Sequence, residues 1–224
     1  MTNYIVATIK PWNIAAFKKH KGRAKNWRLI MDKKDLNLET LRKLRPRYIF
    51  FPHWSWIVPE EILNEFECVC FHMTDVPYGR GGSPLQNLIA RGHKGTKLTA
   101  LRMEKGLDTG PVYMKKPLSL KGDAQDIFER IGAMVYDMMD VIVAKEPMPM
   151  PQRGKAVIFK RRTPKMSQLP KKAEAEKIYD HIRMLDAETY PHAFIWHGDF
   201  ILTFRDAKLG KDGVVKASVE IKKA

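Results

Sequence analysis

The sequence predicts an α/β fold with a mostly parallel sheet, plus a short C-terminal α+β extension. Strand-like and helix-like stretches alternate over residues 1–150, which is typical of βαβ units and therefore of a parallel sheet. A proline-rich break follows, and the remaining residues show short strands joined by a tight turn, as in an antiparallel sheet. We therefore expect two domains, a core at residues 1–150 and an extension at residues 151–224.

The first strands are expected where short β-branched or aromatic runs occur, at residues 5–9, 27–31, 47–51 and 68–72. Helices are expected between them. Pro11 favours a helix start because proline suits the first helical position, and that helix should reach about His20. Leucines from Leu36 to Leu44 have the spacing of an amphipathic helix. Pro59 and the two glutamates after it indicate the start of a third helix.

A glycine-rich loop from Gly79 to Pro84 comes next, with Ser83 in position to cap a helix that Pro84 opens. Strands are then expected at residues 96–103 and 112–118, and the longest helical pattern covers residues 123–144. Beyond the prolines at 147, 149 and 151, the pattern predicts a strand at 156–159, a helix around 178–184, and strands at 192–196, 201–204 and 214–221.

Composition excludes several classes of protein. With 44% hydrophobic residues among 224, the chain can bury a core, so wholesale disorder is excluded. Its two cysteines, Cys68 and Cys70, are too few and too close together for a disulfide framework, and they suit a reducing, cytoplasmic compartment. No apolar run approaches the roughly 18–20 residues of a membrane span, and the first residues lack the basic region of a signal peptide. No membrane partner is expected.

The net charge of +15 indicates an anionic partner without identifying it. Nucleic acid fits such a charge, but any other polyanionic ligand fits it equally well. Basic residues are dense at 10–34 and again at 153–165, yet no arm of the chain carries one sign of charge only. This pattern indicates a basic globular surface rather than a nucleic-acid-binding tail.

His72 and Asp108 are the candidates for acid–base chemistry. His72 ends an expected strand and Asp108 lies in a loop between two others, so both could stand at adjacent strand ends, where α/β proteins bind ligands. An imidazole titrates near neutrality, and a carboxylate can orient it. Taken alone, the pattern favours simpler roles, a strand cap and a turn aspartate.

Other candidate sites give weaker signals. The loop from Gly79 to Pro84 places backbone N–H groups beside Arg80 at a helix start, as phosphate-binding loops do, but it lacks the spacing of the known nucleotide-binding motifs. Cys68, Cys70 and His72 share one strand face, yet three residues on one short strand rarely form a metal site. The other histidines show no ligand spacing. Buried structural cysteines and no metal are therefore expected.

These motifs together resemble one family, the formyltetrahydrofolate-dependent formyltransferases. That family joins a His-x-Ser/Thr-x-x-Pro-x-x-Arg-Gly loop to a later Asp-x-Gly loop, and this chain carries matching residues at 72–81 and 108–110. Residues 51–63, 159–167 and 182–194 resemble segments of the sugar N-formyltransferases within the family. The resemblance covers most of residues 45–205. It implies a Rossmann-like formyltransferase fold, with the catalytic core at residues 1–150.

The resemblance implies that His72 serves as general acid and base on the substrate amine and that Asp108 orients it. The amine would attack the formyl carbon of N10-formyltetrahydrofolate, the expected co-substrate, so negative charge would develop on the formyl oxygen. Family members usually stabilise that charge with an Asn two residues before the His. Cys70 holds this position, and a thiol donates weakly, so protonated His72, a backbone N–H or water would replace it. The alternative is a slow or inactive enzyme, but the intact neighbouring motifs favour activity.

The resemblance also implies two sets of binding residues. Pterin recognition in the family falls on two loops, which here carry Trp54, Ser55, Trp56, Ile57, Met103, Leu107 and Asp108. The amine substrate would lie over Tyr78, Arg80, Gly81 and Gly82. Arg161 and Arg162 are candidates for a pyrophosphate contact, with a solvated basic turn as an equal alternative. From the residues alone, the two tryptophans could stack on a flat heterocycle or pack in the core.

Length and motifs favour a nucleotide-linked amino sugar as the amine. Enzymes for methionyl-tRNA carry a substantial C-terminal barrel, for which the residues after Pro151 leave little room. Enzymes for glycinamide ribonucleotide open with a glycine-rich phosphate loop, where this chain has residues 10–13 of sequence Lys-Pro-Trp-Asn. The sequence thus favours transfer to a UDP-linked 4-amino-4,6-dideoxy sugar, as in the pseudaminic-acid pathway. Methionyl-tRNA and glycinamide ribonucleotide are the alternative substrates.

A function of another class stays open. The positive charge and Cys70 also fit a basic RNA-binding module without catalysis, although the chain lacks RNP-type aromatic strands and any recognised RNA-binding motif. On the favoured interpretation, the partners are a nucleotide-linked amino sugar and folate, and nucleic acid is not expected. A homodimer is compatible with the sequence.

Overall fold

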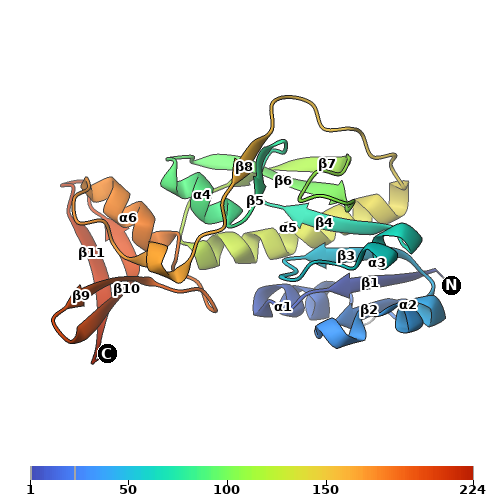
Figure 1. Ribbon diagram of the computed structural model, residues 1–224, viewed down its shortest axis with the longest axis horizontal. Coiled ribbons are helices and arrows are strands. Elements are labelled where there is room, and N and C mark those ends of the chain that lie inside the picture. Colours follow the sequence, from blue (N-terminus) through green and yellow to red (C-terminus); the bar gives the residue numbers. More distant parts are fainter. Residues whose placement is uncertain (1, 23, 224) are drawn as a thin grey trace. The chain divides into compact units, whose positions relative to one another are not determined.

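The computed structural model describes residues 2–22 and 24–223. The chain divides into two compact units, and each is described by itself (Figure 1). Unit 1 comprises residues 1–80, 97–118 and 128–157, and unit 2 comprises residues 81–96, 119–127 and 158–224. The two units interleave along the sequence. The single boundary expected at residue 150 stays a prediction.

A six-stranded sheet forms the centre of unit 1. Its strands are β1 (Asn3–Ala7), β2 (Trp27–Ile30), β3 (Pro46–Pro52), β4 (Cys68–His72), β6 (Gly95–Arg102) and β7 (Val112–Ser119), in the order β2-β1-β3-β4-β6-β7. β1 runs parallel to β2 and β3, and β3 runs parallel to β4, whereas β6 runs antiparallel to β4. The predicted α/β class with a mostly parallel sheet is confirmed.

Helices join the parallel strands, as the alternating pattern predicts. They are α1 (Pro11–His20), α2 (Leu38–Leu44) and α3 (Glu60–Glu65). The long α5 (Ala124–Lys145) follows β7, the last strand of this sheet. The helix predicted from Leu36 begins two residues later because Asn37 caps it. The Asn37 side chain accepts a hydrogen bond of 2.9 Å from the backbone N–H of Thr40. A short 3₁₀ turn, η1 (Lys33–Asp35), precedes α2.

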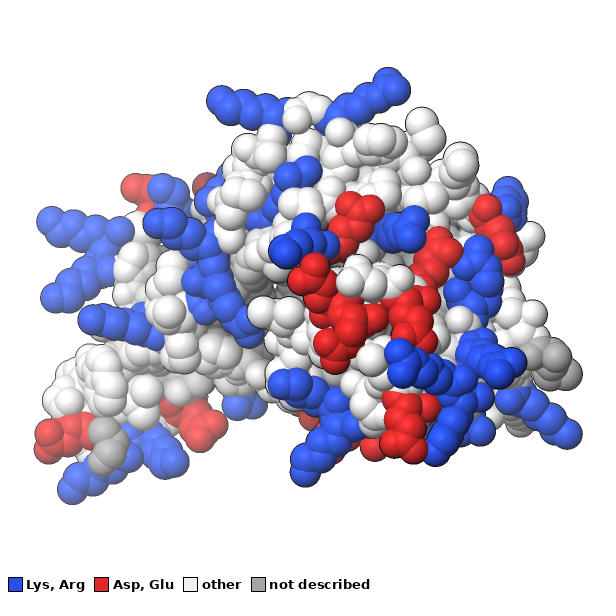
Figure 2. All heavy atoms as spheres, turned by 45° about the vertical axis from the view of Figure 1, so that its right-hand side comes forward, with Lys and Arg blue, Asp and Glu red and all other residues white. Residues whose placement is uncertain are grey.

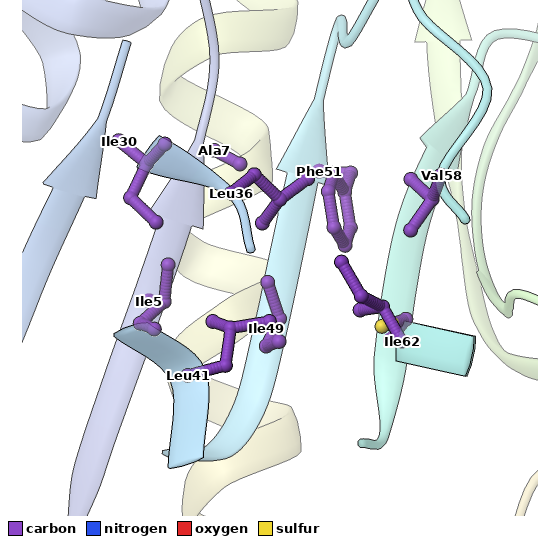
Figure 3. Close-up of a cluster of buried hydrophobic side chains, with 10 residues drawn as sticks. Ile5, Ala7, Ile30, Leu36, Leu41, Ile49, Phe51, Val58 and Ile62 are labelled. Carbon is purple, nitrogen blue, oxygen red and sulfur yellow. The ribbon is translucent and has the colours of Figure 1, made fainter. Parts of the chain in front are cut away.

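One hydrophobic cluster lies between the sheet and the pair α2 and α3. Figure 3 shows side chains from four strands, from α2 and α3 and from the segments before these two helices meeting there. Its buried members are Ile5, Ala7, Ile30, Leu36, Leu41, Ile49, Phe51, Val58, Ile62 and Cys68. Tyr48 and Phe50, which alternate with Ile49 and Phe51, are also buried. Both faces of β3 are therefore covered, which explains why its sequence is a continuous apolar run.

Unit 2 contains a three-stranded antiparallel sheet in the order β11-β10-β9. Its strands are β9 (Ala193–His197), β10 (Phe200–Leu209) and β11 (Val215–Lys223). Gly198 and Asp199 form the turn between β9 and β10, as expected, and the glycine has a positive φ of 57°. α6 (Ala175–Arg183) lies against β10, and α4 (Pro84–Ala90) lies against α6.

A buried arginine holds unit 2 together. The Arg183 side chain is 4% exposed and donates to the carbonyl oxygens of Leu120 at 2.8 Å and Gly122 at 2.7 Å. It also forms an ion pair of 2.6 Å with Asp180. The groups that these N–H donors contact are all acceptors, which is what a buried arginine requires.

The glycine-rich segment differs from the expected loop. Residues Tyr78–Gly81 form a short strand, β5, beside β8 (Val157–Phe159). A Cβ on Gly81 would lie 2.4 Å from the carbonyl oxygen of Phe159, so only glycine permits this approach. Ser83 precedes α4 but does not cap it. Its φ is 49°, and its hydroxyl accepts a hydrogen bond from the backbone N–H of Arg162 at 3.1 Å.

No helix among the described residues is both long enough and apolar enough to cross a membrane.

Leu41 offers a test of the packing in unit 1. It is fully buried in the cluster of Figure 3, so Leu41→Ala should lower the free energy of unfolding by about 3 kcal/mol through lost transfer energy and a residual cavity. Urea denaturation measures this change. Met31→Ala, at a side chain that is 53% exposed, is the control and should change it by less than about 0.5 kcal/mol. A loss below about 1 kcal/mol for Leu41→Ala would contradict the packing.

Candidate active site

The ring of His72 lies between two oxygen acceptors at the end of β4. Its Nε2 is 2.7 Å from the carbonyl oxygen of Gly79, and its Nδ1 is 3.5 Å from Oδ2 of Asp108. The two side chains are 9% and 13% exposed. The structure thus brings together the two residues selected for acid–base chemistry. An imidazole with oxygens at both nitrogens is well placed to take up a proton and return it.

Asp108 reaches His72 by a different route from the one expected. In the register of β4 and β6, His72 lies opposite Thr99, and Val69 lies opposite Arg102. The loop of residues 103–111 therefore leaves β6 beside the first half of β4, and Asp108 does not stand at a neighbouring carboxyl end. The expectation of adjacent strand ends was wrong because β6 runs antiparallel. The loop folds back over β4 and so carries Asp108 to His72.

The backbone of this loop is tightly constrained. Asp108 itself has a φ of 54°, in the left-handed region that residues other than glycine rarely occupy. A Cβ on Gly110 would lie 1.8 Å from the carbonyl oxygen of Arg102, so glycine is required there. The backbone N–H of Arg102 donates to the carbonyl oxygen of Pro111 at 2.9 Å and closes the base of the loop. Sequence alone signals these constraints only through the two glycines of the loop.

Cys70 lies on the same face of β4 as His72, under the Asp108 loop. Burial raises the pKa of its thiol, and the negative charge of Asp108 raises it further. The thiol is therefore neutral at physiological pH. A neutral thiol is a weak hydrogen-bond donor, so Cys70 is a poor substitute for an amide at this position.

Hydrogen bonds fix the segment that follows His72. The hydroxyl of Thr74 donates to the carbonyl oxygen of Gly79 at 3.2 Å, and that of Thr99 donates to the carbonyl oxygen of Thr74 at 2.7 Å. Lys115 binds the carboxylate of Asp75 and, at 2.6 Å, the carbonyl oxygen of Val76. The carbonyl that contacts His72 is thus held by its surroundings.

His53, just after β3, is a half-buried histidine to which the sequence pattern assigns no role. Its ring packs edge-on against Trp12 at 5.4 Å and Phe128 at 4.9 Å. Burial lowers the pKa of His53 to about 3, and the positive charges of Lys10 and His72 contribute. His53 is therefore neutral at physiological pH, and it adds no positive charge beside His72.

The residues expected to recognise the pterin ring occupy two loops with different exposure. Trp54 packs edge-on against Phe51 at 6.0 Å and Trp56 at 4.9 Å, so the core-packing alternative holds for part of its ring. Its indole Nε1 is nevertheless buried without a hydrogen-bond partner. Ser55 is exposed, and the Ile57 side chain is 92% exposed. An unpartnered N–H among apolar groups fits a flat ligand that carries acceptor atoms.

The second of these loops, residues 103–111, lies close to the loop that contains Trp54. Met103 packs against the core cluster, and Leu107 is 66% exposed. Lys105 of this loop is 3.5 Å from Glu60 at the start of α3, which follows the tryptophan-containing loop. The residues present therefore fit a folate, and their assignment to it stays a prediction.

The residues expected to contact the amine substrate are already engaged within the protein. Tyr78 and Arg80 are half-buried, and Gly81 is packed against β8. Gly82 is similarly close to Arg161, since its Cβ would lie 2.6 Å from the Arg161 Cα. Arg161 is exposed, whereas Arg162 donates to the carbonyl oxygen of Met166. The described residues contain no group of three side chains suited to hold a metal ion.

The chain matches known formyltransferases in both sequence and structure. Residues 13–137, more than half of the chain, match the family model described as formyl transferase, and residues 164–222 match the C-terminal domain of methionyl-tRNA formyltransferase. A methionyl-tRNA formyltransferase of Clostridium thermocellum is 46% identical, covers 100% of both chains and has a TM-score of 0.95. The expected formyltransferase fold, with its C-terminal extension, is confirmed.

Two more distant matches complete the comparison. A methionyl-tRNA formyltransferase of Caldanaerobacter subterraneus subsp. tengcongensis is 30% identical, over 78% of this chain and 56% of its own length. The chain thus spans about half the length of such relatives. HypX of Aquifex aeolicus, solved with tetrahydrofolic acid, has a TM-score of 0.75 at 13% identity, over 92% of this chain and 37% of HypX. At that identity the likeness concerns the fold alone.

These matches overturn the nucleotide-sugar interpretation. It rested on the view that the residues after Pro151 are too few for the C-terminal domain of a methionyl-tRNA enzyme, but residues 164–222 match such a domain. Residues 164–222 contain one α-helix and a three-stranded sheet, which is smaller than the barrel expected for methionyl-tRNA enzymes. A sugar N-formyltransferase of Shewanella and a 4-N formyltransferase of Francisella tularensis are each 14% identical to this chain, a likeness of fold alone. The expectation that nucleic acid is no partner was wrong for the same reason.

His53 should make the unfolding free energy sensitive to acid. Its pKa is about 3 in the folded chain against an ordinary 6.5, so below pH 6.5 the unfolded state binds a proton that the folded state does not. The free energy of unfolding therefore decreases as the pH falls below 6.5, and the decrease due to His53 is about 2 kcal/mol at pH 5.

Urea denaturation of the wild type and of His53→Asn at pH 7 and pH 5 measures this effect. Asparagine tolerates the positive φ of this position and does not titrate. The variant should lose about 2 kcal/mol less than the wild type between the two pH values. Equal losses in both proteins would contradict a lowered pKa of His53.

Proposed function

This chain belongs to the formyl transferase family, and from that premise we propose that it transfers the formyl group of N10-formyltetrahydrofolate to the amino group of methionyl-tRNA. The observation that carries the proposal is the likeness to a methionyl-tRNA formyltransferase, which is 46% identical and is matched over the full length of both chains. The match of residues 164–222 to the C-terminal domain of that enzyme supports the same substrate.

In this reaction a bond forms between the amine nitrogen and the formyl carbon, and the bond from that carbon to N10 breaks. The amine loses a proton, and N10 gains one. The contact of 2.7 Å between Nε2 of His72 and the carbonyl oxygen of Gly79 favours a proton on Nε2, so we assign uptake of the amine proton to Nδ1. Asp108, 3.5 Å from Nδ1, then stabilises the imidazolium.

Negative charge on the formyl oxygen needs a hydrogen-bond donor. Cys70 is unsuited to this role because its thiol is neutral and donates weakly. We assign the role to the protonated imidazole of His72 or to a backbone N–H of the loop that carries Asp108. The folate supplies the activated formyl group, and the unpartnered indole N–H of Trp54 with the exposed Ile57 and Leu107 would hold its ring system.

The surface of the chain suits an RNA substrate. The net charge is +15, and Figure 2 shows Lys and Arg side chains spread over the visible face with acidic side chains between them. In unit 2, Trp196 of β9 and Phe200 of β10 are 53% and 43% exposed. The third strand of the same sheet, β11, carries exposed lysines. Aromatic and basic groups of this kind stack on bases and pair with phosphates. Arg161 and Arg162 become proposed contacts to phosphate. A cytoplasmic location, where charged tRNA is made and used, follows from the proposal.

A transfer assay with N10-formyltetrahydrofolate labelled in the formyl group tests the proposal. The wild type should label methionyl-tRNA and leave uncharged tRNA unlabelled. His72→Ala should lower kcat/KM by about 10²–10⁴-fold, the range that a general acid–base group contributes. His93→Ala, a change at another histidine, is the matched control and should stay within about twofold of the wild type. A wild type that fails to label methionyl-tRNA, or full activity in His72→Ala, would contradict the proposal.

A further inference from the structure

We propose that Gln152 is a positioning residue, which holds the Asp108 loop against the segment that follows His72. The inference rests on the proposed function for its catalytic consequence and on hydrogen bonds within unit 1 for its geometry. Sequence patterns do not indicate this residue, because a neutral amide among prolines belongs to no catalytic motif.

Gln152 lies in a strap, defined as residues 150–157, that is anchored at both ends. At one end Met150 and Val112 exchange two backbone hydrogen bonds, of 2.7 and 2.8 Å. At the other end the backbone N–H of Val157 donates to the carbonyl oxygen of Pro77 at 3.0 Å. The strap therefore runs from the start of β7, just after the Asp108 loop, to the segment after His72. Gln152, within this strap, therefore lies beside both the Asp108 loop and the segment after His72.

The side-chain amide of Gln152 makes four hydrogen bonds. Its Oε1 accepts from Nε of Arg80 at 3.1 Å and from Nη2 of Arg80 at 2.8 Å. Its Nε2 donates to the carbonyl oxygens of Asp108 at 2.8 Å and Gly110 at 2.7 Å. The opposite orientation of the amide would place NH₂ against a guanidinium and an oxygen against two carbonyls. The amide is therefore fully satisfied in one orientation only.

These bonds close a ring of contacts around the candidate catalytic pair. His72 contacts the carbonyl of Gly79, the next residue Arg80 binds Gln152, Gln152 binds the backbone of Asp108, and the Asp108 carboxylate returns to His72. Asp108 has a φ of 54°, and a strained backbone of this kind persists only where its surroundings fix it. Gln152 supplies that restraint through two carbonyls of the loop.

Gln152→Glu tests the inference because it keeps the side-chain length and the acceptor for Arg80. It replaces the donor that faces the two carbonyls with a carboxylate oxygen, so the loop should be released. We expect kcat for formyl transfer to fall at least about tenfold, while KM for both substrates stays within about threefold. Arg153→Lys, at the exposed neighbouring residue, is the control and should keep kcat within about twofold.

A double variant separates positioning from general damage. If Gln152 acts through Asp108, then adding Gln152→Glu to Asp108→Asn should lower kcat by less than about twofold. The same tenfold loss in both backgrounds would overturn the inference, because Gln152 would then act independently of Asp108. A changed KM at an unchanged kcat would also overturn it, since that result marks a substrate contact.

A second measurement needs no activity and so separates this inference from the proposed function. Amide hydrogen exchange of residues 103–111 should be faster in Gln152→Glu than in the wild type and in Arg153→Lys. If the wild type formylates nothing but exchange is faster, the proposed function fails and the positioning of the loop stands. Unchanged exchange would overturn the inference whatever the activity.

Discussion

The contact between His72 and Asp108 depends on β6, which runs antiparallel to β4 in a sheet whose strands β1 to β4 are parallel. Because β6 runs against β4, the loop after β6 starts beside the first half of β4 and must return over its face to reach His72. The loop then needs a glycine at position 110, a positive φ at Asp108 and external restraint. The strap at residues 150–157 provides the restraint. The fold thus places the pair, and local contacts keep it in place.

Burial leaves this site with a single imidazole available for proton transfer. The pKa of His53 falls to about 3 because loss of solvent around the ring and the nearby charges of Lys10 and His72 disfavour its charged form, so it is neutral. The pKa of the Cys70 thiol rises through burial and through the charge of Asp108, so it too is neutral. Neither group competes with His72 for protons near neutral pH. On the proposed function, His72 is then the group beside the Asp108 carboxylate whose charge changes during the reaction.

Much of the fold was predictable because its signals are local. Pro11 starts α1, residues 68–72 form a strand, and Gly198 makes a turn, as the residue types indicate. The likeness to formyltransferases also selected His72 and Asp108, which the structure brings together. The direction of β6 was not predictable, since strand periodicity is the same in both directions. Gln152 was missed because its role comes from hydrogen bonds to residues that are distant in the sequence. The sequence pattern favoured another substrate than the one now proposed, because a short C-terminal sheet does not by itself indicate the C-terminal domain of methionyl-tRNA formyltransferase, which residues 164–222 match.

A double-mutant cycle on the catalytic pair tests the account most directly. The quantity to measure is kcat/KM for formylation of methionyl-tRNA by the wild type, His72→Ala, Asp108→Asn and the double variant. If Asp108 acts only through the imidazole, the double variant should be no slower than His72→Ala alone, within about twofold. Losses that multiply in the double variant would show that the two residues act independently and would contradict the account.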